Sequence, residues 1–193
     1  MEPLTLDVHL AVHLATMDSV DTDELAAIAA RTFPLACPPS TPPENIASFI
    51  DANLSPARFA QYLTDPQRAV LTAQQDGRIV GYAMLISGVS DDLDIPPDVQ
   101  QAIDIRPAAE LSKIYLLPEY HGVGVSTALM ELTLATAAEW GVRCVWLGVN
   151  QGNQRAQRFY IKSGFKINGT RTFQVGARRE NDYVMVRELR DHH

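Results

Sequence analysis

A strand is expected near Leu4–Leu14. From there to about residue 64, apolar and polar positions repeat with helical periods. In the stretch DTDELAAIAARTF, an acidic start is followed by apolar residues three to four positions apart, which predicts a helix with one buried face. Five prolines from Pro34 to Pro43 predict that this helix ends before Pro34. A second helical region is expected over roughly residues 43–64.

The middle of the chain carries a hairpin signal. The β-rich runs RAVLTAQQ and RIVGYAMLIS flank Asp76-Gly77, and this dipeptide is typical of a two-residue turn between antiparallel strands. The polar, acidic segment that follows, up to about residue 109, is expected to be a surface connection that can hold a short helix.

The second half of the chain alternates strands and helices. We expect a strand, a helix, a strand, a helix and two closing strands at residues 110–118, 126–140, 143–150, 153–164, 165–175 and 181–189. Strands that alternate with helices are typical of parallel pairing through a crossover helix, whereas the upstream hairpin is antiparallel. The pattern therefore predicts one α/β domain with a mixed central sheet.

Composition narrows the class of protein. The 193 residues are 46% hydrophobic and 20% charged, which is ordinary for a folded globular domain. No apolar run reaches the roughly 18 residues of a membrane span, and the first residues lack the basic start of a signal peptide. A cytoplasmic protein without membrane contact is therefore expected. Cys37 and Cys144 are too few for a disulfide framework or a zinc site, and no metal is expected.

The net charge of −7 comes from 16 basic and 23 acidic residues. Nucleic acid is not expected as a partner, because binding to phosphates needs a basic face. A cationic substrate is compatible with this charge, and Asp91, Asp92 and Asp94 form an acidic group that could attract one. The same three residues also fit a solvated loop.

The stretch HGVGVSTALM places Gly122 and Gly124 between a predicted strand and a predicted helix. The helix over residues 126–140 is apolar nearly all round, so it should be buried with its N-terminus held in place. Free backbone N–H groups and the helix dipole suit such an N-terminus to pyrophosphate, and glycines allow close approach. A Walker loop is excluded because its lysine is missing, and a Rossmann fingerprint because Thr127 stands where its third glycine belongs. On this loop alone, a glycine turn without a ligand fits equally well.

A second motif lies in VNQGNQRAQRFYIKSGF, which reads Asn-x-x-Ala-x-x-Phe-Tyr-x-x-x-Gly-Phe from Asn153 onwards. Together with the preceding strand, glycine loop, buried helix and strand, it resembles the GCN5-related N-acetyltransferase (GNAT) superfamily over about Glu110–Leu189. The stretches SKIYLLPEYHGVGVSTALM, WLGVNQGNQRAQRFYIKSGF and FQVGARRENDYVMV are similar to the bacterial spermine/spermidine acetyltransferase branch. Two positions depart from the family's loop. His121 replaces its Gln or Arg and can still donate to a phosphate, and Ser126, a favoured N-cap residue, replaces its second Gly or Ala.

The resemblance implies a single domain with a GNAT fold, in which about residues 1–109 form the acceptor side and about residues 110–189 bind acetyl-CoA. It implies a primary amine as acceptor and no metal. The residues that it associates with acetyl-CoA are Leu116, Leu117, His121, Gly122, Val123, Gly124, Val125, Ser126, Thr127, Asn150, Asn153 and Arg158. Arg158 forms a basic stripe with Arg155 and Lys162, which fits either the adenosine 3′-phosphate or a solvated helix face.

Acetyl transfer from a thioester needs a deprotonated amine, a stabilised oxyanion and a proton for the leaving thiolate. Tyr160 matches the family's tyrosine near the sulfur and is interpreted as the acid, with packing against Phe159 as the alternative. Glu110 lies at the start of the strand where the family often has a carboxylate that acts through water as the base. A glutamate that is merely exposed to solvent at a strand start would give the same pattern. By family analogy, backbone N–H groups near Leu116 and Leu117 would hold the pantetheine and the acetyl carbonyl.

Three functions remain open at this point. The first is acetylation of a small amine such as spermidine or spermine, and the second is acetylation of a protein N-terminus or lysine. The third is a non-catalytic sensor that binds acyl-CoA, against which the retention of Asn153 and Tyr160 argues. Family members are often dimers, so the resemblance is compatible with a homodimer.

Overall fold

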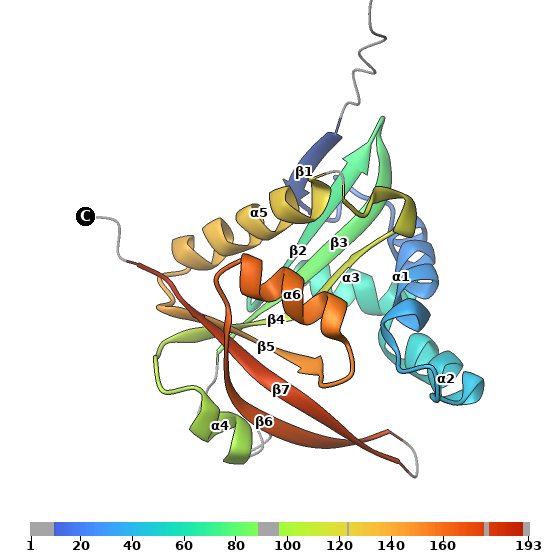
Figure 1. Ribbon diagram of the computed structural model, residues 1–193. Coiled ribbons are helices and arrows are strands. Elements are labelled where there is room, and N and C mark those ends of the chain that lie inside the picture. Colours follow the sequence, from blue (N-terminus) through green and yellow to red (C-terminus); the bar gives the residue numbers. More distant parts are fainter. Residues whose placement is uncertain (1–9, 89–96, 123, 176–177, 191–193) are drawn as a thin grey trace, which may run out of the picture.

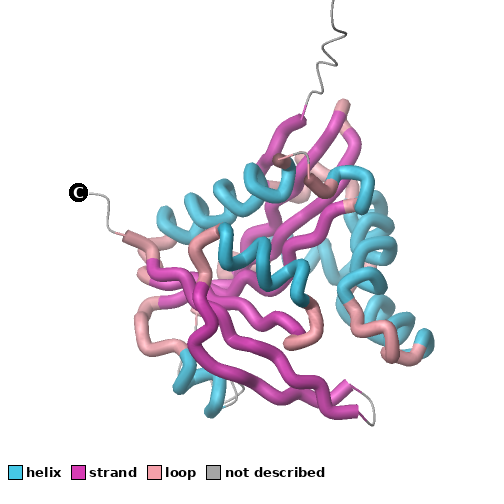
Figure 2. The backbone as a smooth tube through the Cα atoms, in the orientation of Figure 1, coloured by secondary structure: helices cyan, strands magenta, loops and turns pink. Residues whose placement is uncertain are grey.

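The computed structural model describes residues 10–88, 97–122, 124–175 and 178–190. They form one seven-stranded sheet of order β1-β2-β3-β4-β5-β7-β6 with helices on both faces, which confirms the predicted fold (Figures 1 and 2). The strands are β1 (Leu10–Leu14), β2 (Arg68–Gln75), β3 (Arg78–Ser87), β4 (Ala108–Leu116), β5 (Cys144–Asn150), β6 (Lys166–Val175) and β7 (Arg178–Glu188). The helices are α1 (Thr22–Ala36), α2 (Pro43–Asn53), α3 (Pro56–Thr64), α4 (Pro97–Ala102), the 3₁₀ turn η1 (Pro118–Tyr120), α5 (Val125–Glu139) and α6 (Gln154–Lys162). No helix within these ranges is long and apolar enough to cross a membrane.

Neighbouring strands are antiparallel except for β4 and β5, which are parallel. The helix α5 connects these two strands, as the predicted crossover requires. The β2–β3 turn is the predicted hairpin, in which Asp76 (φ 51°) and Gly77 (φ 79°) both have left-handed backbone. Two central residues with positive φ give a turn whose twist matches that of the flanking strands.

Helices from the two halves of the chain cover opposite faces of the sheet. Leu129 of α5 and Phe159 of α6 pack on one face, and Leu25 of α1 and Phe59 of α3 pack on the other. Figure 1 shows α5 and α6 in front of the sheet and α3 behind it. Only one side of α5 is buried. The exposed residues of the helix are Thr127, Glu131, Ala135, Ala138 and Glu139.

Two helix boundaries differ from the prediction. The helix α1 continues through Pro34 to Ala36. A proline in the last turn removes only one hydrogen bond of the helix, and Cys37 N–H still closes that turn by donating to Pro34 O (3.3 Å). The single helical region expected over residues 43–64 is two helices, α2 and α3. Ser55 separates them as the N-cap of α3, where its side chain accepts from Arg58 N–H (3.2 Å).

The connection between β3 and β4 contains the predicted short helix, α4, but this part of it is not a surface segment. Val99 and Ile103 are both 1% exposed and pack with Trp146 against the sheet. Residues 89–96 of the connection lie outside the described residues.

The outer strands also differ from the predicted bounds. The described part of the first strand begins at Leu10, so the start of the strand expected over Leu4–Leu14 lies outside the described residues. The last strand begins at Arg178, three residues earlier than predicted, because Arg178 pairs with Val175 of β6.

Candidate active site

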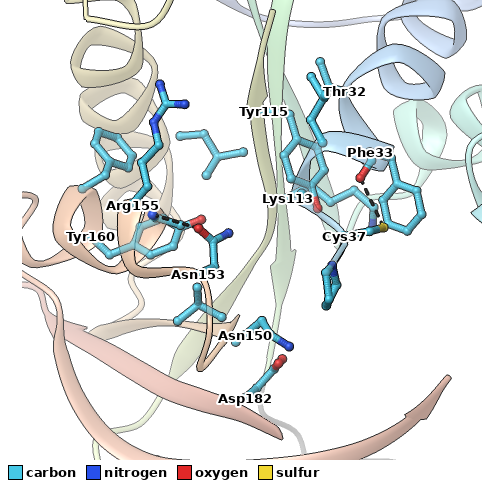
Figure 3. A pocket seen from close by; sticks show the side chains of 18 of the residues that line it. Thr32, Phe33, Cys37, Lys113, Tyr115, Asn150, Asn153, Arg155, Tyr160 and Asp182 are labelled. Carbon is cyan, nitrogen blue, oxygen red and sulfur yellow. Dashed lines mark hydrogen bonds between the residues drawn. The ribbon is translucent and has the colours of Figure 1, made fainter. Parts of the chain in front are cut away.

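The centre of the sheet opens into a cleft. The strands β4 and β5 pair only through Ala108–Glu110 and Cys144–Trp146, and both continue beyond these residues without pairing to each other. The space between them is a cavity of about 820 Å³. Residues of α1, α2 and their connection line one side, and residues of α6 and the start of α5 line the other. Figure 3 shows Cys37 on the first side and Tyr160 on the second.

Most of the residues predicted from the sequence meet in this cleft. Those that line it are Glu110, Leu116, His121, Gly122, Ser126, Asn150, Asn153, Arg158 and Tyr160. Leu117, Gly124, Val125 and Thr127 do not line it, and Val123 lies outside the described residues. Gly124 and Val125 instead line a small separate pocket beside β1, and Thr127 is exposed.

Leu117 cannot serve the pantetheine in the way that was expected. Its backbone N–H donates to Val80 O (2.9 Å), and its side chain is buried in the core. The backbone donor is therefore already used within the sheet. Leu116 remains at the edge of the cleft.

The loop between β4 and α5 presents the start of the helix to the cleft. Gly122 (φ 82°) and Gly124 (φ 84°) both have left-handed backbone, which accounts for two glycines in three positions. The first hydrogen bond within the helix runs from Ala128 N–H to Gly124 O (3.1 Å), so the preceding N–H groups have no helical acceptor. The N-cap is Gly124, whereas Ser126 occupies the second helical position. Free N–H groups and the helix dipole suit this end of the cleft to an anion.

His121 connects this loop to α6 and to the end of β4. Arg155 on α6 donates from Nη2 to His121 Nδ1, and arginine has no acceptor, so Nδ1 carries no proton. The other ring nitrogen, Nε2, donates to Leu116 O at the end of β4 (3.1 Å), because a carbonyl oxygen can only accept. His121 thus anchors the loop, and its ring N–H is not available for the expected donation to a phosphate.

The helix α6 brings Tyr160 into the cleft. Asn153 caps this helix by accepting a backbone N–H of the first turn (3.2 Å), and Asn150 lies at the end of β5 just before it. The rings of Tyr160 and Phe165 pack edge to face with centroids 6.0 Å apart. Burial raises the pKa of Tyr160 to about 12, so the phenol keeps its proton at neutral pH. Packing of the ring and proton donation by the hydroxyl are therefore compatible.

A β-bulge lies in β4 where the cleft begins. Ser112 is an extra residue between two residues that pair with adjacent positions of β3. Residues three apart on a regular strand point to opposite faces, but the bulge turns Lys113 to the same face as Glu110. Both side chains line the cleft.

Glu110 and Lys113 are half-buried, and burial favours the neutral form of each. Burial raises the pKa of Glu110, and the nearby cations, Arg171 foremost, oppose this shift. Burial lowers the pKa of Lys113, while the charge of Glu110 opposes that shift. A carboxylate with a raised pKa is a stronger base, which fits Glu110 as a proton acceptor.

Arg171 and Asp182 form an ion pair in the cleft wall. They are register partners on β6 and β7, and Arg171 donates from Nε and Nη2 to Asp182 Oδ2 (3.1 and 3.0 Å). Asp182 is 4% exposed, and burial raises its pKa although Arg171 opposes the shift. Gly148 on β5 makes room for the pair, because a Cβ at this position would overlap the Arg171 guanidinium.

The α1–α2 side of the cleft is mainly apolar. Phe33 and Phe49 stack with ring centroids 4.4 Å apart, and Lys113 Nζ lies 6.0 Å from the Phe49 centroid. Cys37 donates from Sγ to Phe33 O (3.4 Å), and burial raises the pKa of its thiol, which makes it a poor nucleophile (Figure 3). In the part of the chain that the structure describes, no group of three or more His, Cys, Asp or Glu side chains is placed to hold a metal ion.

The cleft residues that the sequence motifs missed include Lys113, Tyr115, Arg171 and Asp182. The face of Lys113 and Tyr115 depends on the bulge, which the strand pattern does not indicate. The pairing of Arg171 with Asp182 could have been found, because the two residues are equally far from the point where β6 and β7 meet in the sequence.

Known proteins are similar to this chain in sequence and in fold. The model of the acetyltransferase (GNAT) family matches residues 24–165. An uncharacterized N-acetyltransferase of Mycobacterium tuberculosis is 69% identical over 169 residues, which are 88% of this chain and 98% of the relative. An N-alpha-acetyltransferase of Sulfurisphaera tokodaii is 29% identical over 135 residues, which are 68% of this chain and 75% of the relative.

Among solved structures, the PaiA N-acetyltransferase of Thermoplasma acidophilum, in complex with coenzyme A, has the same fold. The TM-score is 0.70 at 20% sequence identity, and the match covers 93% of this chain and 99% of that one. The narrower resemblance to the spermine/spermidine branch stays a prediction. The family match and the 69% identical relative confirm the assignment that the loop and helix motifs predicted: the chain belongs to the acetyltransferase (GNAT) family of enzymes.

Proposed function

We propose that this protein is an N-acetyltransferase that transfers the acetyl group of acetyl-CoA to a primary amine. The observation that carries the proposal is the cleft between β4 and β5. It has the free N–H groups of the α5 start at one end, and both Glu110 and Tyr160 line it.

The cleft fits acetyl-CoA in three places. The start of α5, beside Gly122 and Ser126, suits the pyrophosphate. Beyond Glu110, the edge of β4 that faces β5 pairs with no strand that the structure describes, so its backbone groups can bind the amides of the pantetheine. Arg158 and Lys162 line the same cleft and can meet the adenosine 3′-phosphate. The PaiA neighbour, which was solved with coenzyme A, supports this use of the fold.

The side chains also fit the chemistry. Acetyl-CoA supplies a thioester whose carbonyl carbon can be attacked by an amine. Glu110, with its raised pKa, can take the proton from the amine, either directly or through water. Tyr160 keeps its phenolic proton at neutral pH and can donate it to the sulfur. Backbone N–H groups of β4 next to the bulge can hold the carbonyl oxygen as negative charge develops on it.

The size of the cleft favours a small acceptor. A cavity of about 820 Å³ has to hold both the pantetheine arm and the acceptor, and this is the size of a small-molecule pocket. A protein N-terminus as acceptor is suggested by the name of the Sulfurisphaera relative, an N-alpha-acetyltransferase. The polyamine hypothesis rests on the resemblance to the spermine/spermidine branch, on the acidic net charge and on Asp91, Asp92 and Asp94, which lie outside the described residues, so it stays a prediction.

The test combines acetyl-CoA binding with turnover. The purified protein is given acetyl-CoA with a panel of small amines and a peptide with a free N-terminus. Binding is measured by calorimetry, and transfer by release of free thiol and by the mass of the product. We expect thiol release that depends on a small amine and is lost in Tyr160→Phe. Tyr183→Phe, which changes a half-buried tyrosine outside the cleft, is the matched control. Acetyl-CoA binding without transfer to any amine would instead identify a non-catalytic acyl-CoA-binding protein.

A further inference from the structure

We propose that the amine acceptor also carries a carboxylate, which Lys113 binds. This inference rests on the proposed function, because it names the class of acceptor for the same cleft. It follows from the way in which β4 presents one carboxylate and one ammonium side by side without pairing them.

Glu110 and Lys113 present opposite charges to the cleft on the sheet face opposite α5. The bulge at Ser112 turns both side chains to the face opposite α5, whereas the neighbouring Leu111 and Ile114 pack toward that helix. The ion pairs of the described residues do not include one between Glu110 and Lys113, so their charged atoms are more than 4.0 Å apart. A ligand with the complementary pair of charges can therefore satisfy both.

Lys113 has no ion-pair partner among the described residues. Its Nζ donates to Ser112 Oγ (3.2 Å), a neutral group on the adjacent residue, and lies 6.0 Å from the centroid of the Phe49 ring. An ammonium group has three donors, and a half-buried one has lost part of its hydration. Burial also lowers the pKa of Lys113, as expected for a cation that gains too little from its surroundings.

The two other cations that influence Glu110 have carboxylate partners. Arg171 pairs with Asp182 (3.0 Å), and Arg68 pairs with Asp65 (3.2 Å). Lys113 forms no ion pair with any residue that the structure describes. It is therefore the cation on this side of the cleft that is left for an anionic group of the ligand.

A zwitterionic amine matches this arrangement. Its amino group lies toward Glu110, which would take the proton, and its carboxylate lies toward Lys113 beside α2. Glu110 and Lys113 together carry no net charge, which suits a ligand of no net charge. A polyamine would bring a further cation near Lys113, and like charges repel more strongly where water is partly excluded. The site therefore favours a small amino acid or a related amino carboxylate.

The test uses acceptors that differ only in the carboxylate, namely L-ornithine against putrescine and L-phenylalanine against phenethylamine. With the wild-type protein we expect kcat/KM to be at least about tenfold higher for the carboxylate-bearing member of one pair or both, chiefly through a lower KM. Lys113→Met should remove most of this preference, and Lys113→Arg should keep it, because a guanidinium also binds carboxylates. Lys166→Met removes an exposed lysine outside the cleft and is the matched control. Thermal melting verifies folding, and Lys113→Gln replaces the Met variant if that one does not fold.

The possible results separate this inference from the proposed function. Equal or higher efficiency for the amines without a carboxylate would overturn the inference alone, since amines would still be acetylated. An equal fall of kcat for both members of a pair in Lys113→Met would also overturn it, because Lys113 would then act on the reaction rather than on the carboxylate. Acetyl-CoA binding without transfer to any amine would refute the proposed function, and the inference with it.

Discussion

Replacing Arg171 with Met should destabilise the protein far more than the loss of an exposed ion pair. Arg171 donates two hydrogen bonds to one oxygen of Asp182 (3.1 and 3.0 Å), and the Asp182 side chain is 5% exposed. Breaking a buried pair by removing one partner costs about 3–5 kcal/mol, and we expect about 3 kcal/mol here because water can enter from the cleft. For a chain of this length, that corresponds to a decrease in Tm of roughly 6–12 °C.

The loss should depend on pH. Burial raises the pKa of Asp182 above its ordinary value of 3.8, and Arg171 opposes this shift. Without Arg171 the folded-state pKa rises further, so the folded protein holds a proton that the unfolded chain releases. A carboxyl group with a raised folded-state pKa stabilises the fold at low pH, and this contribution is lost as the pH rises through that pKa. The deficit of the variant should therefore be larger at about pH 8 than at about pH 5.

Urea unfolding at both pH values measures the deficit, with two further variants for comparison. Glu119→Gln breaks the pair of Arg31 and Glu119 (3.9 Å; 60% and 64% exposed) and should cost less than about 1 kcal/mol. Asp182→Asn should lie between the two at about 1–2 kcal/mol, because the amide oxygen still accepts a hydrogen bond. The reasoning is refuted if Arg171→Met costs no more than Glu119→Gln, or if its deficit is the same at both pH values.

Three further predictions concern the cleft. Tyr160→Phe should lower kcat by about 10²–10⁴-fold in steady-state kinetics with little change in Tm, since the ring contacts remain and only the proton donor is lost; an unchanged kcat would leave Tyr160 with a packing role. Gly122→Ala and Gly141→Ala each place a Cβ at positive φ (82° and 78°) in open space, so each should cost about 1–2 kcal/mol. Only Gly122→Ala should raise the Kd for acetyl-CoA in calorimetry, and an equal rise in both would contradict an anion site at the start of α5. Gly148→Ala should displace the Arg171 guanidinium and lower the urea midpoint as Arg171→Met does, whereas an unchanged midpoint would mean that the ion pair shifts without loss.

Features decided by neighbouring residues could be predicted from the sequence. The Asp76-Gly77 hairpin and the glycine loop before α5 both depend on positive φ angles, which glycine and aspartate tolerate better than most residues. The order of the elements from β4 to α6 followed from the change between strand and helix patterns. The family motif then placed Tyr160 on α6, where it lines the cleft.

Proline positions indicated the ends of the helices less well than glycine positions indicated the turns. Pro34 was expected to stop α1, but a proline in the last turn leaves the earlier hydrogen bonds of the helix intact. Ser55-Pro56, in contrast, lies within the region expected to be one helix and begins a new one. This signal was present in the sequence, since serine is favoured at the N-cap and proline at the first helical position.

The positions of Lys113 and Asp182 in the cleft depend on contacts between distant parts of the chain. Lys113 reaches the face of Glu110 only because Ser112 is inserted relative to β3, and a strand pattern read without its partner cannot show an inserted residue. Asp182 becomes a cleft residue through its pairing with Arg171 across the β6–β7 register. Glu110, Lys113, Arg171 and Asp182 are each of a residue type that is common on protein surfaces. The sheet pairing brings their side chains together in the cleft.

The cleft itself arises because β4 and β5 belong to different parts of the sheet. Apart from the bulged Ser112, β4 pairs with β3 over residues 109–116, and β5 pairs with β7 along its whole length. The two parts are joined only by Ala108–Glu110 and Cys144–Trp146. Beyond this junction, the facing edges of β4 and β5 carry backbone donors and acceptors that no described strand satisfies, and unpaired groups of this kind are costly once water is excluded. A ligand rich in amides, such as pantetheine, can bind such an edge as an added strand would. The sequence of each strand does not indicate how many partners it has, so only the pairing in the structure shows that these edges of β4 and β5 have no partner among the described strands.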